Sequence, residues 1–191
     1  TYVASLAAGG ADPQNAFVGA APFATIGVVK LKGAKEFLRD FFFVKEGTVA
    51  FQENDIIAGV SYLNRLAYEL NMPLSLCISL GSNWGSHDGA GPLSNVLDSL
   101  VSRRKRSVAV AAGNESNQRH HYRGTITENG DFQNVEINVG ANVGGFTLEL
   151  WSRVSETFTV EIISPTGERI PRLTPQNVRR EYTFIFENTR V

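Results

Sequence analysis

The sequence predicts an α/β domain with a parallel sheet and flanking helices over residues 1–118, followed by an antiparallel β module over residues 119–191. The first part alternates short apolar runs with amphipathic helical patterns, which is typical of parallel strands joined by crossover helices. The last part shows period-two alternation with turn signals and no helical stripe. That pattern of alternation favours a β-sandwich or jelly-roll-like module. The change from helical to period-two patterning places the expected domain boundary between Asn117 and Arg123.

The first predicted strand and helix lie in the first third of the chain. Residues 25–31 (TIGVVKL) form the predicted strand. Apolar residues at mixed three- and four-residue spacing predict a helix over 55–70, with Asn54 or Asp55 available as its N-cap. Pro73 ends this helix, because proline cannot continue the helical hydrogen bonding.

A second strand, helix and strand follow. Residues 74–80 (LSLCISL) predict a strand covered on both faces, so Cys77 is expected in the core. Pro92 stands at the first turn of a second amphipathic helix, whose apolar stripe runs to Leu100. Residues 107–112 (SVAVAA) are the next predicted buried strand.

Further strands are predicted in the β module. Apolar and polar residues alternate over 146–151 and again over 158–162. The tripeptide 165–167 (PTG) predicts a turn, and residues 180–186 offer one more strand.

Composition excludes several classes of protein. With 191 residues the chain is long enough for a substantial core. The 18 Lys and Arg against 19 Asp and Glu give a net charge of -1, so no nucleic-acid partner is expected. A single cysteine excludes an intramolecular disulfide framework. No apolar stretch reaches the roughly 18 residues of a membrane span. The sequence also lacks a glycine motif for phosphate binding, so no nucleotide cofactor is predicted.

Three polar clusters have simple interpretations. The basic run 103–106 (RRKR) is compatible with a processing site or a basic patch, and we interpret it as a solvated helix end. Ser86, His87 and Asp88 are the residue types of a hydrolytic triad, but consecutive side chains point in different directions and make no relay. His120 and His121 lack a third ligand at metal spacing, so no metal site is predicted.

The carboxyl ends of the two central strands are the predicted functional site. Ligands of parallel sheets bind at these ends, and small residues there let a substrate come close. An amide donor at position 114 is suited to stabilise a developing oxyanion. The candidate site residues are Ser79, Leu80, Gly81, Ala111, Ala112, Gly113 and Asn114.

Four motifs, in order over residues 1–116, resemble subtilisin-like serine proteases. Residues 108–115 (VAVAAGNE) resemble the oxyanion-hole motif, and residues 78–81 (ISLG) resemble a strand that forms one wall of the S1 pocket. Residues 19–24 (GAAPFA) are similar to the turn before a strand, and residues 1–5 (TYVAS) resemble the helix after the catalytic histidine. The resemblance implies a partial subtilisin-like fold.

The resemblance also implies roles for the site residues. It makes Asn114 the oxyanion donor, with residues 79–81 and 111–113 as pocket walls. Tyr2 stands where the family motif has its second histidine, and the serine motif G-T-S-x-A is not found in the sequence. We therefore expect a central fragment of a longer serine endopeptidase, with the Ser, His and Asp of the triad outside this sequence and no activity in the fragment alone.

The β module resembles one group within this family. Residues 119–122 (RHHY), 145–151 (GFTLELW) and 163–168 (ISPTGE) resemble the clostridial Csp-type subtilases of spore germination, in which a jelly-roll module lies between the oxyanion asparagine and the nucleophilic serine. The resemblance implies a polypeptide substrate, proteolytic activation of a cortex-lytic enzyme, and an extracellular or spore-associated location. A propeptide or a related pseudoprotease is an implied partner.

Two alternatives remain open at this point. The first is a non-catalytic pseudoprotease that serves as a signalling or binding scaffold, because the triad residues are absent from the sequence. The second is an unrelated α/β enzyme that binds a small ligand at the strand ends.

Overall fold

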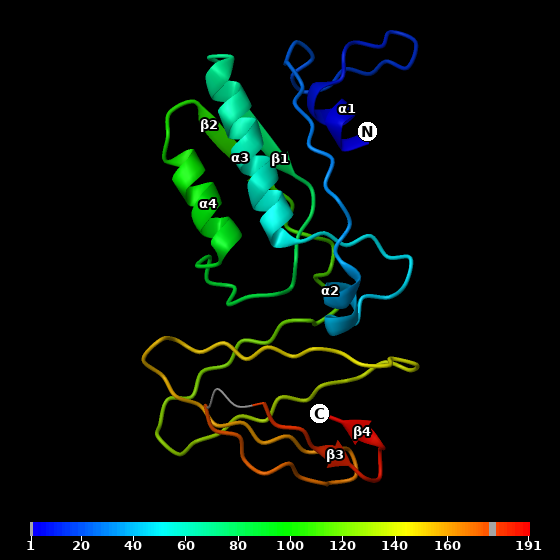
Figure 1. Cartoon of the computed structure of the whole chain (residues 1–191), viewed down its shortest axis with the longest axis vertical. Coiled ribbons are helices and arrows are strands. Elements are labelled where there is room, and N and C mark those ends of the chain that lie inside the picture. The colour runs from blue at the N-terminus through cyan, green and yellow to red at the C-terminus, as the bar shows by residue number, and fades with distance from the viewer. Residues whose placement is uncertain (1, 176–178) are drawn as a thin grey trace. The chain divides into compact units, whose positions relative to one another are not determined.

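The computed structural model describes residues 2–175 and 179–191, and the chain forms two compact units, Thr1–Leu148 and Glu149–Val191 (Figure 1). The first unit contains every helix that the structure describes and a parallel pair of strands. Its elements are α1 (Tyr2–Ala8), α2 (Glu36–Phe41), α3 (Glu53–Glu69), β1 (Leu74–Ile78), α4 (Pro92–Val101) and β2 (Arg106–Val110). The second unit contains the short strands β3 (Thr183–Phe184) and β4 (Thr189–Arg190).

The core of the first unit is a small parallel sheet with two helices. β1 pairs with β2 in parallel, from Leu74 opposite Arg106 to Ile78 opposite Val110. α3 packs on β1, α4 packs on β2, and the two helices contact each other (Figure 1). The buried cluster between them consists of Val60, Leu76, Ile78 and Leu100. The predicted parallel α/β arrangement with flanking helices is confirmed for this part of the chain.

Helix α3 begins two residues before the predicted start. Its N-cap is Gln52, which makes no side-chain capping bond, so the predicted capping by Asn54 or Asp55 is wrong. Glu53 and Asp55 lie in the first turn instead, where a negative charge complements the positive end of the helix dipole. Asp55 also pairs with Lys32, with 3.2 Å between Oδ1 and Nζ.

Helix α4 begins where the sequence predicts. Pro92 occupies its first turn, where the missing N–H has no intrahelical partner to lose. The next backbone N–H, of Leu93, donates to Oε1 of Glu53 at 3.0 Å. The start of α3 therefore caps the start of α4, which fixes one helix against the other.

Cys77 is exposed, which corrects the prediction that it lies in the core. Side chains alternate between the two faces of a strand. Leu76 and Ile78 are buried, whereas Ser75 and Cys77 are exposed. The two helices cover one face of the sheet, and the described residues leave Cys77 uncovered on the other, so the prediction of a strand covered on both faces is also wrong.

The predicted strand over residues 25–31 is wrong. The segment forms no strand, and β1 and β2, the parallel strands of the described part, pair with each other alone. The segment instead packs along α3. A Cβ added at Gly59 would lie 3.2 Å from Cγ1 of Val29, and one at Gly27 would lie 3.0 Å from Cδ2 of Leu63. The apolar run therefore reflects packing on a helix.

Antiparallel pairing in the second unit is sparse. β3 pairs with β4, and isolated bridges join Val160 to Leu173 and Ile163 to Arg169. Residues 146–151 form no strand, and residues 158–162 contribute a single bridge. The predicted long strands are thus reduced to short pairs, because few of their backbone groups have a partner among the described residues. Antiparallel pairing is observed, and the structure gives no support for a jelly roll.

The turn over residues 165–167 is confirmed. The N–H of Gly167 donates to the carbonyl oxygen of Ser164 at 3.0 Å, and Gly167 has a φ of +91°, which glycine adopts at little cost.

In the sequence, the boundary between the two units falls between Leu148 and Glu149. Residues 119–148 belong to the first unit. Gly145, for example, lies against the ring of Phe43, where an added Cβ would be 2.5 Å from Cε1. The domain boundary between residues 118 and 119 stays a prediction.

Glu187 ties the turn of the second unit to the strand β3. Its Oε1 accepts bonds from the Thr166 hydroxyl at 2.6 Å and from the Thr166 N–H at 3.1 Å. The Thr166 hydroxyl above all, then that of Ser164, lowers the pKa of Glu187 to about 2, against the raising effect of partial burial. Hydrogen bonds to the charged form favour ionisation.

The second unit should lose stability in acid through Glu187. Because the pKa is lower in the folded state, this stabilisation is complete above the ordinary value of 4.5 and is lost as the pH falls toward about 2. The Glu187→Gln variant should show a flatter stability profile over this interval, measured by acid unfolding followed by circular dichroism. Glu156→Gln is the control, since the Glu156 side chain is exposed. A wild-type profile in Glu187→Gln would contradict this assignment.

Candidate functional site

The ends of β1 and β2 lie next to each other. Ile78 and Val110 are opposite one another in the last register pair, and the N–H of Ala111 donates to the carbonyl oxygen of Ile78 at 3.0 Å. Residues 79–81 and 111–114 therefore leave the sheet at one common edge. The structure brings together the two segments that the sequence analysis singled out, while their roles remain a prediction.

Most of the candidate site residues are accessible. Leu80 is half-buried and packs against the core cluster, which anchors the segment after β1. The Asn114 side chain is exposed, and none of the residues that the structure describes forms a hydrogen bond with it. Its amide is thus free to donate to an incoming group. The exposed members of the set are Ser79, Gly81, Ala111, Ala112, Gly113 and Asn114.

Gly113 sets the direction of the chain immediately before Asn114. Its φ is +88°, a left-handed conformation that places a Cβ too close to the following carbonyl oxygen. Glycine is therefore required for an unstrained turn at this position.

The Gly113→Ala substitution should lower the free energy of unfolding by about 1 kcal/mol. The matched control is Gly81→Ala, because φ of Gly81 lies outside the left-handed region and an added Cβ there meets open space. Urea unfolding of both variants measures the difference. Equal stability of the two variants would show that the turn at Gly113 is not strained by a side chain.

A polar bridge joins the two loops that follow the strands. Nδ2 of Asn83 donates to Oε2 of Glu115 at 2.5 Å, and Nδ1 of His120 lies 3.2 Å from the same oxygen. The Asn83 amide above all, and then His120, lower the pKa of Glu115 below its usual value. The charged carboxylate next to Asn114 therefore holds the loop after β1 against the loop after β2.

A pair of stacked histidines forms a second link between these loops. The rings of His87 and His121 lie 4.4 Å apart, inclined by 18°. Nε2 of His87 is 3.0 Å from the carbonyl oxygen of Asn83, and the Ser86 hydroxyl donates to the Asp88 carboxylate. Ser86 therefore bonds to Asp88 and not to His87, and these consecutive residues form no relay, as the sequence analysis predicts.

The same region offers no metal site within the described residues. No group of three or more His, Cys, Asp or Glu side chains is arranged to hold a metal over residues 2–175 and 179–191. His120 faces Glu115, whereas His121 stacks on His87. Among the helices that the structure describes, none has the length and apolar character to cross a membrane.

The sequence analysis did not predict either of the two links between the loops. Asn83 and Glu115 are 32 positions apart, and no local pattern joins them. One signal was available. Parallel strands bring their carboxyl-end loops together, and both loops carry histidines, so His87 and His121 were candidates for contact.

Comparison with solved structures identifies a similar protein. The chain resembles the CspB protease of Clostridium perfringens, with a TM-score of 0.67 and 26% sequence identity. The structural neighbour is a protease. The match covers 94% of this chain and 36% of the CspB chain, so this chain spans about a third of the neighbour. No protein-family model and no curated protein matches the sequence.

The likeness is consistent with a partial subtilase-like fold. It agrees with the parallel strands and flanking helices of the first unit.

Proposed function

We propose that this chain forms the central part of a subtilisin-like serine endopeptidase in which Asn114 is the oxyanion donor. The observation that carries the proposal is the exposed, unpartnered Asn114 amide at the joined carboxyl ends of two parallel strands. The likeness to the CspB protease supports it. In this reading the triad Ser, His and Asp are supplied from outside the given sequence.

The proposed mechanism is acyl transfer in two stages. A serine Oγ attacks the peptide carbonyl carbon while a histidine accepts the serine proton, and the carbonyl oxygen becomes an oxyanion. Nδ2 of Asn114 donates to this oxygen, and the histidine then protonates the leaving amine. Water hydrolyses the acyl-enzyme through a second oxyanion at the same position. Asn114 thus acts on both tetrahedral intermediates.

Residues 79–81 and 111–113 are the proposed walls of the substrate pocket. They are short or small side chains apart from Leu80, which is turned to the core cluster. Exposed backbone at this edge can bond an extended polypeptide by strand addition. The proposed substrate is therefore a polypeptide, and the reaction needs no cofactor.

The wider role is proposed from the resemblance of residues 119–122, 145–151 and 163–168 to the Csp-type subtilases of spore germination. The neighbour is a clostridial protease, and we place this protein in spore germination, as a spore-associated or extracellular protease that activates a cortex-lytic enzyme by cleavage. Residues 119–191 are proposed to be a jelly-roll-like module that stabilises the protease or presents a docking surface. A propeptide or a related pseudoprotease is proposed as a partner of the protein.

A pseudoprotease is the second candidate. It is favoured by the lack of recognisable triad motifs in the given sequence, where Tyr2 stands at the position of the second motif histidine. Such a protein would use the same edge of the sheet to bind a partner without cleaving it.

Peptide-bond hydrolysis by the full-length protein tests the proposal. The protein is incubated with an unfolded protein substrate, and new amino termini are identified by mass spectrometry. We expect cleavage at defined sites that a serine-directed phosphonate abolishes. Intact substrate after prolonged incubation with folded protein would favour the pseudoprotease.

A further inference from the structure

A second candidate site lies on the helices, away from the residues of the strand ends. A cavity of about 410 Å³ opens between the second half of α3 and the turn that joins α4 to β2. Four of its seven lining residues are arginines, and the other three carry hydroxyl or amide groups. The lining consists of Ser61, Asn64, Arg65, Tyr68, Arg103, Arg104 and Arg106. We call it the arginine pocket.

Local structure fixes one arginine of the pocket firmly. Nε of Arg106 donates to Oδ1 of Asn64 at 2.7 Å, and Nη1 donates to the carbonyl oxygen of Met72 at 3.2 Å. Lys105, just before it, has a φ of +62°, a conformation that costs energy in a residue with a side chain. The tight turn therefore delivers Arg103, Arg104 and Arg106 to one place.

The positive charge of the pocket is poorly compensated. Arg65 pairs with Glu69 at 3.8 Å, and both side chains are largely exposed. Within the described part of the chain, Arg103, Arg104 and Arg106 form no ion pair. Cations at the end of α4 complement its dipole. That effect does not account for Arg65, which projects into the same cavity from the body of α3.

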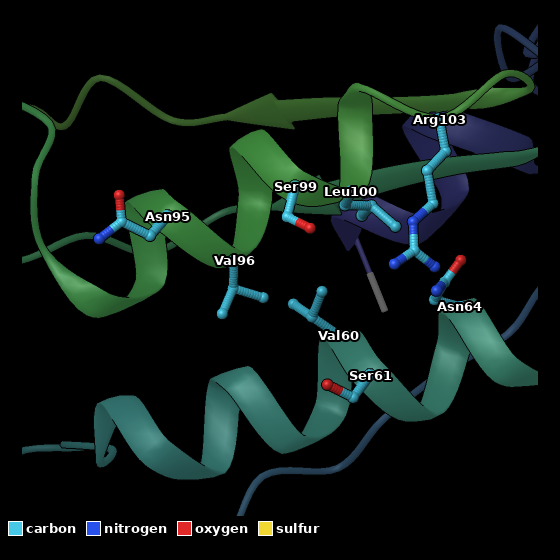
Figure 2. Close-up of a pocket in the computed structure, with 8 residues that line it drawn as sticks. All are labelled: Val60, Ser61, Asn64, Asn95, Val96, Ser99, Leu100 and Arg103. Atoms are coloured by element: carbon cyan, nitrogen blue, oxygen red, sulfur yellow. The ribbon is translucent and has the colours of Figure 1, made fainter.

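An adjoining cavity extends the pocket along the two helices. This cavity, of about 320 Å³, shares Ser61, Asn64 and Arg103 with the arginine pocket. Figure 2 shows Arg103 reaching from the end of α4 toward Asn64 on α3, while Val60 and Val96 face each other further along. The groove thus has an apolar stretch and a strongly basic end.

We propose that the arginine pocket binds a small polyvalent oxyanion, a phosphate or a polycarboxylate. Guanidinium groups bind such oxygens through paired, charge-assisted hydrogen bonds. The hydroxyls of Ser61 and Tyr68 add neutral donors at the rim. A bound anion would also relieve the mutual repulsion of the clustered cations. The pocket shares no residue with the strand ends, so this inference is independent of the proposed proteolysis.

Calorimetric titration of the full-length protein with citrate and with inorganic phosphate tests the inference. Ionic strength is held constant with chloride, because salt screens the attraction between exposed charges and would change apparent anion binding at any site. We expect saturable binding of at least one anion. The Arg103→Ala/Arg104→Ala variant should bind it about tenfold more weakly or worse, which is the effect of losing a charge-assisted bond. Arg123→Ala, at an exposed arginine outside the pocket, should bind like the wild type.

Each outcome decides the inference. Loss of binding in the double variant with retention in Arg123→Ala supports the site, and the tighter of the two probes gives the class of ligand. Absence of saturable binding, or equal binding by all variants, overturns it. Should the double variant fail to fold by circular dichroism, Arg65→Ala replaces it, because that side chain is 69% exposed and its loss spares the core.

Discussion

The Asn114→Ala variant of the full-length protein should hydrolyse peptide bonds roughly 10² to 10³ times more slowly than the wild type. The substitution removes a donor that acts on the oxyanion of the transition state, so the loss should appear in kcat while KM changes little. The Asn114 side chain is exposed and bonds none of the described residues, and its removal should therefore leave the stability of the folded protein nearly unchanged. Steady-state kinetics with a fluorogenic peptide measure both constants.

Asn117→Ala is the matched control. Asn117 is an exposed asparagine three positions further along the same loop, and its loss should change kcat by less than about twofold, as for a surface substitution. An Asn114→Ala variant with wild-type kcat would remove Asn114 from the mechanism, whatever the fate of the rest of the proposal.

The Leu76→Ala variant should lower the free energy of unfolding by about 2–5 kcal/mol. Leu76 is 5% exposed and packs with Val60, Ile78 and Leu100 between the sheet and the helices. Truncation removes buried methyl groups and leaves a cavity that the neighbouring helices fill only in part. Denaturant unfolding, followed by circular dichroism, gives the loss as a shift in the midpoint.

Leu70→Ala provides the comparison for this core variant. Leu70 is the C-cap residue just after α3 and is 52% exposed, so its truncation should cost about 0.5 kcal/mol or less, as for surface positions. Equal losses in the two variants would mean that the cluster around Leu76 is not the core that holds the sheet to the helices.

Periodicity predicted the elements that have one apolar face. The stripe of α4 and the apolar run of β1 were found because each buries a face that repeats along the sequence. The same reasoning failed for residues 25–31. An apolar run indicates that a segment is packed against another element, but it does not identify whether that element is a strand or a helix. Here the partner is α3, through contacts such as Val29 with Gly59.

Alternation was a weaker guide in the β module. It predicted long strands over 146–151 and 158–162, whereas the described residues pair only briefly, at bridges such as Val160 with Leu173. A strand requires a neighbour for its backbone groups, and alternation within one segment carries no information about that neighbour.

The candidate site also has one part that the sequence predicts and one part that it does not. Its position followed from topology alone, because parallel strands 74–78 and 106–110 must end at one edge. The bridge from Asn83 to Glu115 could not be predicted, since it depends on the conformation of two exposed loops.

Labelling of the full-length protein with a serine-directed phosphonate probe tests the central claim most directly. The account predicts that one serine becomes covalently modified, with a stoichiometry near one, and that the Asn114→Ala variant is labelled far more slowly because the phosphonyl oxygen loses its donor. Peptide mapping would place the modified serine outside the given sequence. A folded protein that takes up no probe would contradict the account, and would leave the two strand ends as a surface for binding a partner.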